Sequence, residues 1–90
     1  MQTVADTGPI VSAADPRDEA HGLAAALVSA LGRVLVVPDT VMVEVDCLLR
    51  ARVGLRSARA FVATLVAGEH STAFLTPGLL RRAAEIDARY

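Results

Sequence analysis

Three short apolar runs, separated by stretches with helical periodicity, divide the chain into its predicted elements. We expect strands over residues 2–5, 34–37 and 72–75. The middle run is apolar without alternation, which is typical of a strand covered on both faces in a parallel sheet. Between and after these runs, apolar side chains at helical spacing predict helices over residues 10–14, 16–31, 41–53, 57–67 and 77–90. The apolar side of the helix over residues 16–31 is expected to carry Ala20, Leu23, Ala24, Leu27 and Leu31.

Helix boundaries are marked by a few local signals. Asp15-Pro16 and Thr76-Pro77 each place a capping side chain before a proline, which is typical of a helix start. Asp39 or Thr40 is expected to cap the helix over residues 41–53, and Gly32, Gly54 and Gly68 are expected to end or break helices. The resulting order, β-α-α-β-α-α-β-α, predicts an α/β fold: a three-layer sandwich with a parallel sheet and right-handed crossovers.

Asp6 closes the first predicted strand and precedes a predicted turn, Thr7-Gly8-Pro9. Ligands of open α/β sheets bind just outside the carboxyl ends of the strands. An acid at this place is either a residue that stabilises a turn through its side chain or a functional group. The residues around Asp6 do not decide between these interpretations.

Glu44 is a second acid of interest because its helical neighbours are apolar. On a helix it shares a face with Val41, Cys47 and Leu48, so we expect its carboxylate to point toward the protein. A buried carboxylate needs a partner, a metal or a proton. Asp46 is rotated away and is expected to be a surface residue paired with Arg50 four positions on.

Both Asp6 and Glu44 are expected at the carboxyl edge of the sheet. Two carboxylates converging there can hold a hard divalent cation such as Mg2+, which takes oxygen ligands. Such an ion can activate water for phosphodiester cleavage. A structural turn at Asp6 and a solvated Glu44 explain the same pattern equally well.

Composition limits the chemistry further. Ninety residues make one domain, with 53% hydrophobic and 3% aromatic residues and a net charge of −1. Lysine is absent, which excludes a Walker-A lysine and a Schiff base, and no dinucleotide-binding glycine pattern occurs. No run is long enough to span a membrane and no signal peptide is recognisable. The single Cys47 lies in an apolar helical pattern, which predicts a buried, inert thiol and suits a reducing cytoplasm.

The remaining ionisable residues favour surface positions. Four arginines flank Gly54, and they are either a phosphate-binding patch or solvated helix ends, of which we favour the second: Arg50, Arg52, Arg56 and Arg59. Neither His21 nor His70 has a second ligand at metal spacing, so both are expected at the surface.

Several segments in order resemble the PIN-domain ribonucleases, and more narrowly the VapC toxins of bacterial VapBC toxin–antitoxin pairs. The likeness spans residues 1–90 and rests on these segments: Val4-Ala5-Asp6-Thr7-Gly8-Pro9-Ile10, Val36-Val37-Pro38, Val43-Glu44-Val45 and Leu48-Leu49-Arg50. The resemblance implies that Asp6 and Glu44 bind Mg2+, with Mn2+ as an alternative, and that Thr7 supports the metal shell. It also implies an RNA substrate, a VapB-type antitoxin and, as is common in that family, a homodimer.

One departure limits what the resemblance implies. The family's third acidic position follows the last helix seen here, at the start of the next helix. Asp87 lies inside the last helix, so it is no substitute. We therefore expect the N-terminal two-thirds of a PIN domain, with the strand carrying Asp6 at an open edge, and little ribonuclease activity from this chain alone.

The alternative is a non-catalytic toxin remnant that binds an antitoxin or itself. A haloacid-dehalogenase-like enzyme is disfavoured because position 8 is Gly and no Lys is present.

Overall fold

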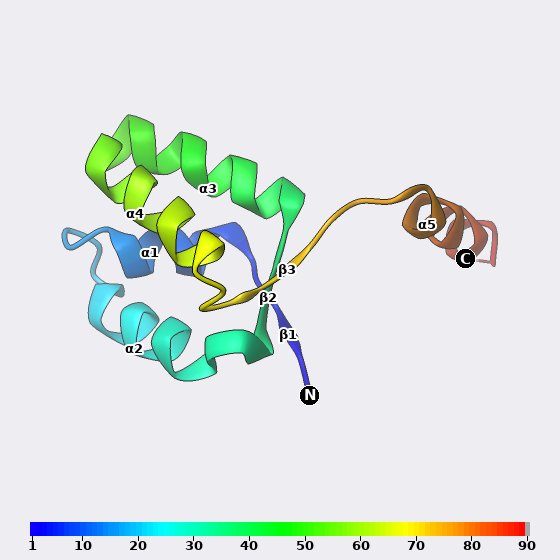
Figure 1. Cartoon of the computed structure of the whole chain (residues 1–90), viewed down its shortest axis with the longest axis horizontal. Coiled ribbons are helices and arrows are strands. Elements are labelled where there is room, and N and C mark those ends of the chain that lie inside the picture. The colour runs from blue at the N-terminus through cyan, green and yellow to red at the C-terminus, as the bar shows by residue number, and fades with distance from the viewer. Residues whose placement is uncertain (90) are drawn as a thin grey trace.

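The computed structural model describes residues 1–89 and has an α/β fold with a small parallel sheet (Figure 1). The predicted class, parallel sheet and order of elements are confirmed. The elements, in chain order, are β1 (Thr3–Val4), α1 (Thr7–Ala14), α2 (His21–Leu31), the 3-10 helix η1 (Gly32–Val34), β2 (Leu35–Pro38), α3 (Asp39–Arg52), α4 (Leu55–Val66), β3 (Ser71–Ala73) and α5 (Pro77–Arg89).

The sheet has the strand order β1-β2-β3, and β2 pairs in parallel with both neighbours. Thr3 lies opposite Leu35, and Val36 lies opposite Ser71. Within residues 1–89, β1 pairs with β2 alone, so the strand that leads to Asp6 is at an edge of the sheet. The most apolar run of the sequence is therefore the central strand, as its lack of alternation indicates.

Alternate residues of β2 build the core against the helices. Leu35 is 5% exposed and Val37 is fully buried. They form one cluster with buried residues of α1, α3 and α4, and Val28 of α2 packs against it. Both helical crossovers therefore lie on the same face of the sheet, as two right-handed crossovers in one direction require. The described residues thus form two layers of the expected three-layer sandwich. The other buried members of the cluster are Ala5, Ile10, Val11, Val45, Leu49 and Ala58.

Helix α5 stands apart from this body (Figure 1). An extended segment after β3 carries it away from the other helices, and the molecule measures 43 Å along its longest axis. The predicted start is confirmed, since the Thr76 Oγ1 accepts a hydrogen bond from the Leu79 N–H at 3.1 Å. Its large apolar side chains are exposed, among them Leu80 at 55%. Tyr90, which was expected in this helix, lies outside the described residues.

Two predictions about the first half of the chain are wrong. Thr7-Gly8-Pro9 is the first turn of α1 and not a separate turn, because Asp6 caps the helix directly. Asp15-Pro16 does not start a helix: the side chains of Asp15 and Asp18 accept hydrogen bonds from the N–H groups of Arg17 and Ala20 and so stabilise turns. Helix α2 therefore begins only at His21.

The buried face of α2 also differs from the expected one. Leu23 and Leu27 were expected on its apolar side, yet they are 78% and 53% exposed. Ala24 and Leu31 face the core as expected, and Val28 packs there with them. None of the helices described over residues 1–89 is long and apolar enough to cross a bilayer.

Candidate functional site

Asp6 lies between β1 and α1, and its carboxylate caps the helix. The Asp6 Oδ1 accepts a hydrogen bond from the Thr7 N–H at 2.9 Å. The backbone of Asp6 is extended while the chain turns helical at the next residue, which is the usual geometry of an N-cap. The side chain is exposed, and Oδ2 takes no part in the cap. Asp6 is thus a structural cap that still presents one oxygen to a ligand.

Thr7 connects Asp6 to Glu44 across the carboxyl edge. Its side chain is buried, at 8% exposure, and its hydroxyl donates a hydrogen bond to the Glu44 Oε2 at 3.1 Å. This bond joins the first turn of α1 to α3, 37 positions along the chain. The structure therefore places Glu44 beside the residue that follows Asp6, at the positive end of the α1 dipole.

The prediction that Glu44 is buried is wrong, because its side chain is exposed at the rim of α3. Val45 and Leu49 occupy the core-facing side of that helix, and both are fully buried. Glu44 precedes Val45 by one position and is rotated about 100° away from it. Its carboxylate therefore lies at the surface, where a solvated ion can approach, while one oxygen accepts from the buried Thr7 hydroxyl.

The oxygen atoms of Asp6 and Glu44 are of the kind that a hard cation prefers, and the Thr7 hydroxyl holds Glu44 in place. Over residues 1–89, no group of three or more His, Cys, Asp or Glu residues is close enough together to hold a metal ion. Among the described residues, the candidate metal ligands are therefore the two carboxylates of Asp6 and Glu44. Metal binding by this pair stays a prediction.

A third acid at this edge was assigned only a capping role by sequence reasoning. Asp39 directly follows β2, and its Oδ1 accepts a hydrogen bond from the Thr40 N–H at 2.8 Å. Its Oδ2 accepts another from the Leu75 N–H at 2.9 Å, which ties the end of β2 to the segment after β3. The signal that could have revealed it is the one that revealed Asp6: an acid directly after a strand.

Other residues of α3 divide between confirmed and wrong predictions. Asp46 pairs with Arg50 as expected, at 2.9 Å. The Asp46 Oδ1 is buried and has no hydrogen-bond partner among the described residues. The thiol of Cys47 was expected in the core, yet Cys47 is exposed, because it lies on the side of α3 opposite Val45.

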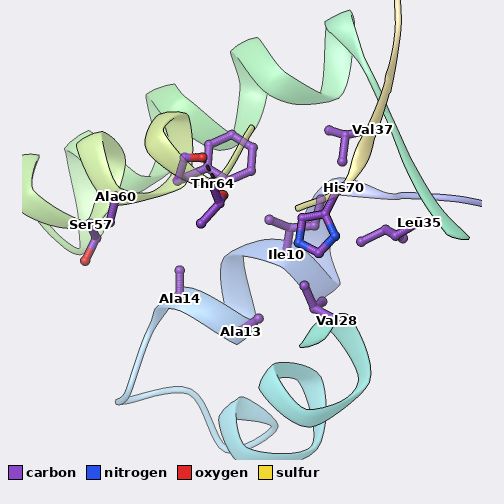
Figure 2. Close-up of a pocket in the computed structure, with 11 residues that line it drawn as sticks. Ile10, Ala13, Ala14, Val28, Leu35, Val37, Ser57, Ala60, Thr64 and His70 are labelled. Carbon is purple, nitrogen blue, oxygen red and sulfur yellow. Dashed lines mark hydrogen bonds between the residues drawn. The ribbon is translucent and has the colours of Figure 1, made fainter. Parts of the chain in front are cut away.

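A mostly apolar hollow lies apart from this edge, between α1, α2 and α4 over the sheet (Figure 2). Ile10, Val28 and Leu35 line it, and the ring of His70 lies among them (Figure 2). His70 is half-buried and not a surface residue, because its Nδ1 hydrogen-bonds to the Gly32 carbonyl oxygen at 2.8 Å. The remaining lining residues are Ala13, Ala14, Val37, Ser57, Ala60, Phe61 and Thr64.

His21 was also expected at the surface, and it is half-buried. Its Nδ1 lies 3.0 Å from the Ser12 carbonyl oxygen, so it joins the start of α2 to α1. Both histidines therefore form hydrogen bonds with main-chain carbonyl oxygens near helix ends. The sequence contains no signal for these contacts, because each partner is a backbone atom distant along the chain.

Comparison with protein-family models and with curated proteins returned no match. Among solved structures, the chain is similar to the crystal structure of VapC20 of Mycobacterium tuberculosis, which is described as a toxin that cleaves the sarcin–ricin loop. The two share 26% sequence identity with a TM-score of 0.77. The match covers 97% of this chain and 67% of that chain.

Proposed function

We propose, on the premise that the chain has the fold of the VapC-type PIN-domain toxins, that it is a metal-dependent endoribonuclease of a toxin–antitoxin pair. The likeness to VapC20 confirms the family that the sequence motifs indicated. The observation that carries the proposal is the link between Asp6 and Glu44 through Thr7, whose backbone N–H donates to Asp6 and whose hydroxyl donates to Glu44. It joins two carboxylate positions at the carboxyl edge, where α/β folds bind ligands.

Each residue of this edge has a separate task in the proposed site. Asp6 and Glu44 would hold Mg2+, or Mn2+ in its place, through carboxylate oxygens. Thr7 fixes the orientation of Glu44 by donating to its Oε2, because a buried hydroxyl has few other rotamers open to it. When bound, the ion supplies a water of lowered pKa and positive charge for the phosphodiester oxygens.

Two carboxylates hold Mg2+ weakly, because the ion then keeps most of its waters. We therefore expect the 90-residue chain by itself to bind the metal weakly and to cleave RNA slowly. In a cell, the partners would be an RNA substrate and a VapB-type antitoxin, and the compartment would be the cytoplasm. A homodimer is proposed on the family likeness alone.

The test measures cleavage of a labelled RNA with Mg2+ or Mn2+, together with metal binding by titration calorimetry. Asp6→Asn and Glu44→Gln should each abolish any cleavage and weaken Mn2+ binding, while Asp46→Asn should change neither. Asparagine caps helices as well as aspartate does, so Asp6→Asn isolates the lost charge from the lost cap. Cleavage that survives Asp6→Asn would disprove the proposed site, and fast cleavage that Asp6→Asn abolishes would disprove only the expected weak activity.

A second candidate function is a binding module without catalysis, which the apolar hollow of Figure 2 favours. Exposed apolar surface between helices is suited to packing an apolar segment of a partner chain. A VapB-type antitoxin would fit this role whether or not the toxin cuts RNA. Stable co-purification with an antitoxin, lost on Val28→Asp, together with no cleavage in the presence of Mn2+, would favour this candidate over the enzyme.

A further inference from the structure

Charge is distributed unevenly along this chain. Residues 47–68, which form the end of α3 and all of α4, contain four arginines and no acid. The rest of the chain carries five arginines against ten acids. A chain with a net charge of −1 therefore has one strongly basic region, at the turn between α3 and α4.

The structure separates the arginines near this turn into engaged and free ones. Arg50 forms an ion pair with Asp46, and Arg17 pairs with Asp15 and donates to the Arg52 carbonyl oxygen. Arg52, Arg56 and Arg59 are exposed, and none of them forms an ion pair within the described part of the chain. We call these last three residues the elbow arginines.

One elbow arginine, Arg52, lies at a fixed distance from the proposed metal edge, because α3 carries both Arg52 and Glu44. Glu44 and Arg52 are eight positions apart on α3. This separation is about 12 Å along the helix axis, at 1.5 Å per residue. A nucleic-acid strand with 3.4 Å per nucleotide covers it in about four nucleotides. Arg56 and Arg59 are three positions apart on α4, so they face the same side of that helix.

We propose that the elbow arginines bind the phosphate backbone of an RNA strand whose scissile bond lies at the Asp6–Glu44 edge. This inference rests on the proposed ribonuclease function and adds a second contact surface to it. The guanidinium group is planar and always charged, and it binds phosphate oxygens in pairs. Aromatic residues make up only 3% of the chain, so base stacking contributes little. The contact is therefore electrostatic and independent of base sequence.

The experiment measures the affinity of the full 90-residue chain for a labelled single-stranded RNA at several salt concentrations, with EDTA present. Arg56→Gln/Arg59→Gln removes two elbow charges, and Arg81→Gln/Arg82→Gln removes two exposed charges from α5 as the matched control. Each phosphate contact contributes about 0.7 to the slope of log affinity against log salt. The elbow variant should therefore lower that slope by about 1.4, and affinity at about 0.1 M salt by roughly 25-fold. The α5 control should lower the slope, and the logarithm of the affinity, by less than a third of the decreases expected for the elbow variant.

A second variant separates lost charge from lost structure. Arg56→Lys/Arg59→Lys keeps both charges, so it should keep the salt slope of the original chain while losing some affinity from the paired hydrogen bonds. Equal losses in the elbow and control variants, or a lysine variant as weak as the glutamine variant, would overturn the proposal. Tighter binding of a polyglutamate peptide than of RNA, dependent on the same arginines, would also overturn it in favour of an acidic protein partner.

The outcome is independent of the cleavage assay, because EDTA removes the divalent ions. RNA binding that depends on the elbow arginines, without cleavage under any metal, would retain the surface and reject the enzyme. Cleavage that depends on Asp6 but is insensitive to the elbow variant, at limiting RNA, would retain the enzyme and reject the surface.

Discussion

Helices α4 and α5 have similar amphipathic patterns and opposite surroundings. In α4, Ala58 is fully buried, and Phe61 and Leu65 pack against the core. In α5, Leu79 and Leu80 are 52% and 55% exposed. The difference shows that an apolar stripe predicts a helix, while burial depends on what faces the stripe. Helix α4 belongs to the crossover that returns the chain from β2 to β3, so it lies against the sheet. The segment before α5 leads away from the sheet (Figure 1).

The largest expected effect comes from Leu49 of α3, which is fully buried. Leu49→Ala should lower the free energy of unfolding by about 3–4 kcal/mol, since it removes buried methyl groups and leaves a cavity. Leu80→Ala in α5 should change it by less than about 0.5 kcal/mol. Urea denaturation followed by circular dichroism measures both. Equal losses would mean that α5 packs on the body in solution.

Overpacking provides a smaller test of the same contrast. Ala58→Leu adds three carbons where α4 meets the core, so it should cost about 1–3 kcal/mol of unfolding free energy. Ala83→Leu makes the same change on exposed α5 and should be neutral within about 0.5 kcal/mol. A neutral Ala58→Leu would show that α4 can move away from the sheet.

Helix caps extend the comparison to local stability. Asp6→Ala should lower the free energy of unfolding by about 1 kcal/mol, because α1 belongs to the cooperative core. Thr76→Ala removes the equivalent cap from α5. It should leave the urea midpoint unchanged and accelerate amide hydrogen exchange in α5 alone. A shift of the midpoint by Thr76→Ala would contradict the separation of α5 from the core.

The smallest effect concerns Asp15, in the turn between α1 and α2. The hydrogen bond from the Arg17 backbone N–H, supported by the Arg17 side chain, lowers the pKa of Asp15 below its usual value. Because the folded-state pKa is lowered, the stabilisation is present above the unfolded-state pKa and is lost as pH falls through the folded-state pKa. Arg17→Gln keeps the N–H, so it should raise the Asp15 pKa only in part. A carboxyl NMR titration measures this, and full restoration would assign the shift to the guanidinium.

Helices and strands could be predicted from the sequence where their boundaries or apolar runs are encoded in the residues of the element itself. The unbroken apolar run of β2 and the Thr76-Pro77 start of α5 are local, and the structure confirms both. The start of α2 was missed because Asp15 and Asp18 cap turns as readily as helices. The buried side of α2 was predicted only in part, because its apolar residues spread over a wide stripe and the stripe does not show which of its edges meets the core.

The sequence predicted which acidic residues lie at the carboxyl edge of the sheet, but it did not predict the hydrogen bonds that they make there. Sequence patterns located Asp6 and Glu44, and a supporting role for the Thr7 hydroxyl, which donates to Glu44, was anticipated only from the family resemblance. The bond from Leu75 to Asp39 joins segments 36 positions apart and has no sequence signature. Glu44 was expected inside because it shares a helical face with Val41, Cys47 and Leu48. The core-facing side of α3 is instead centred on Val45 and Leu49, about 100° away from Glu44.

The position of β1 at the edge of the sheet also affects folding during synthesis. Thr3 pairs with Leu35, so the strand leading to Asp6 has no partner until 32 more residues have been translated. At roughly 5–20 residues per second, this delay is about 2–6 seconds, plus the time spent in the ribosomal exit tunnel. Strand β1 therefore stays unpaired until β2 has been made, and chaperones can bind it during that interval.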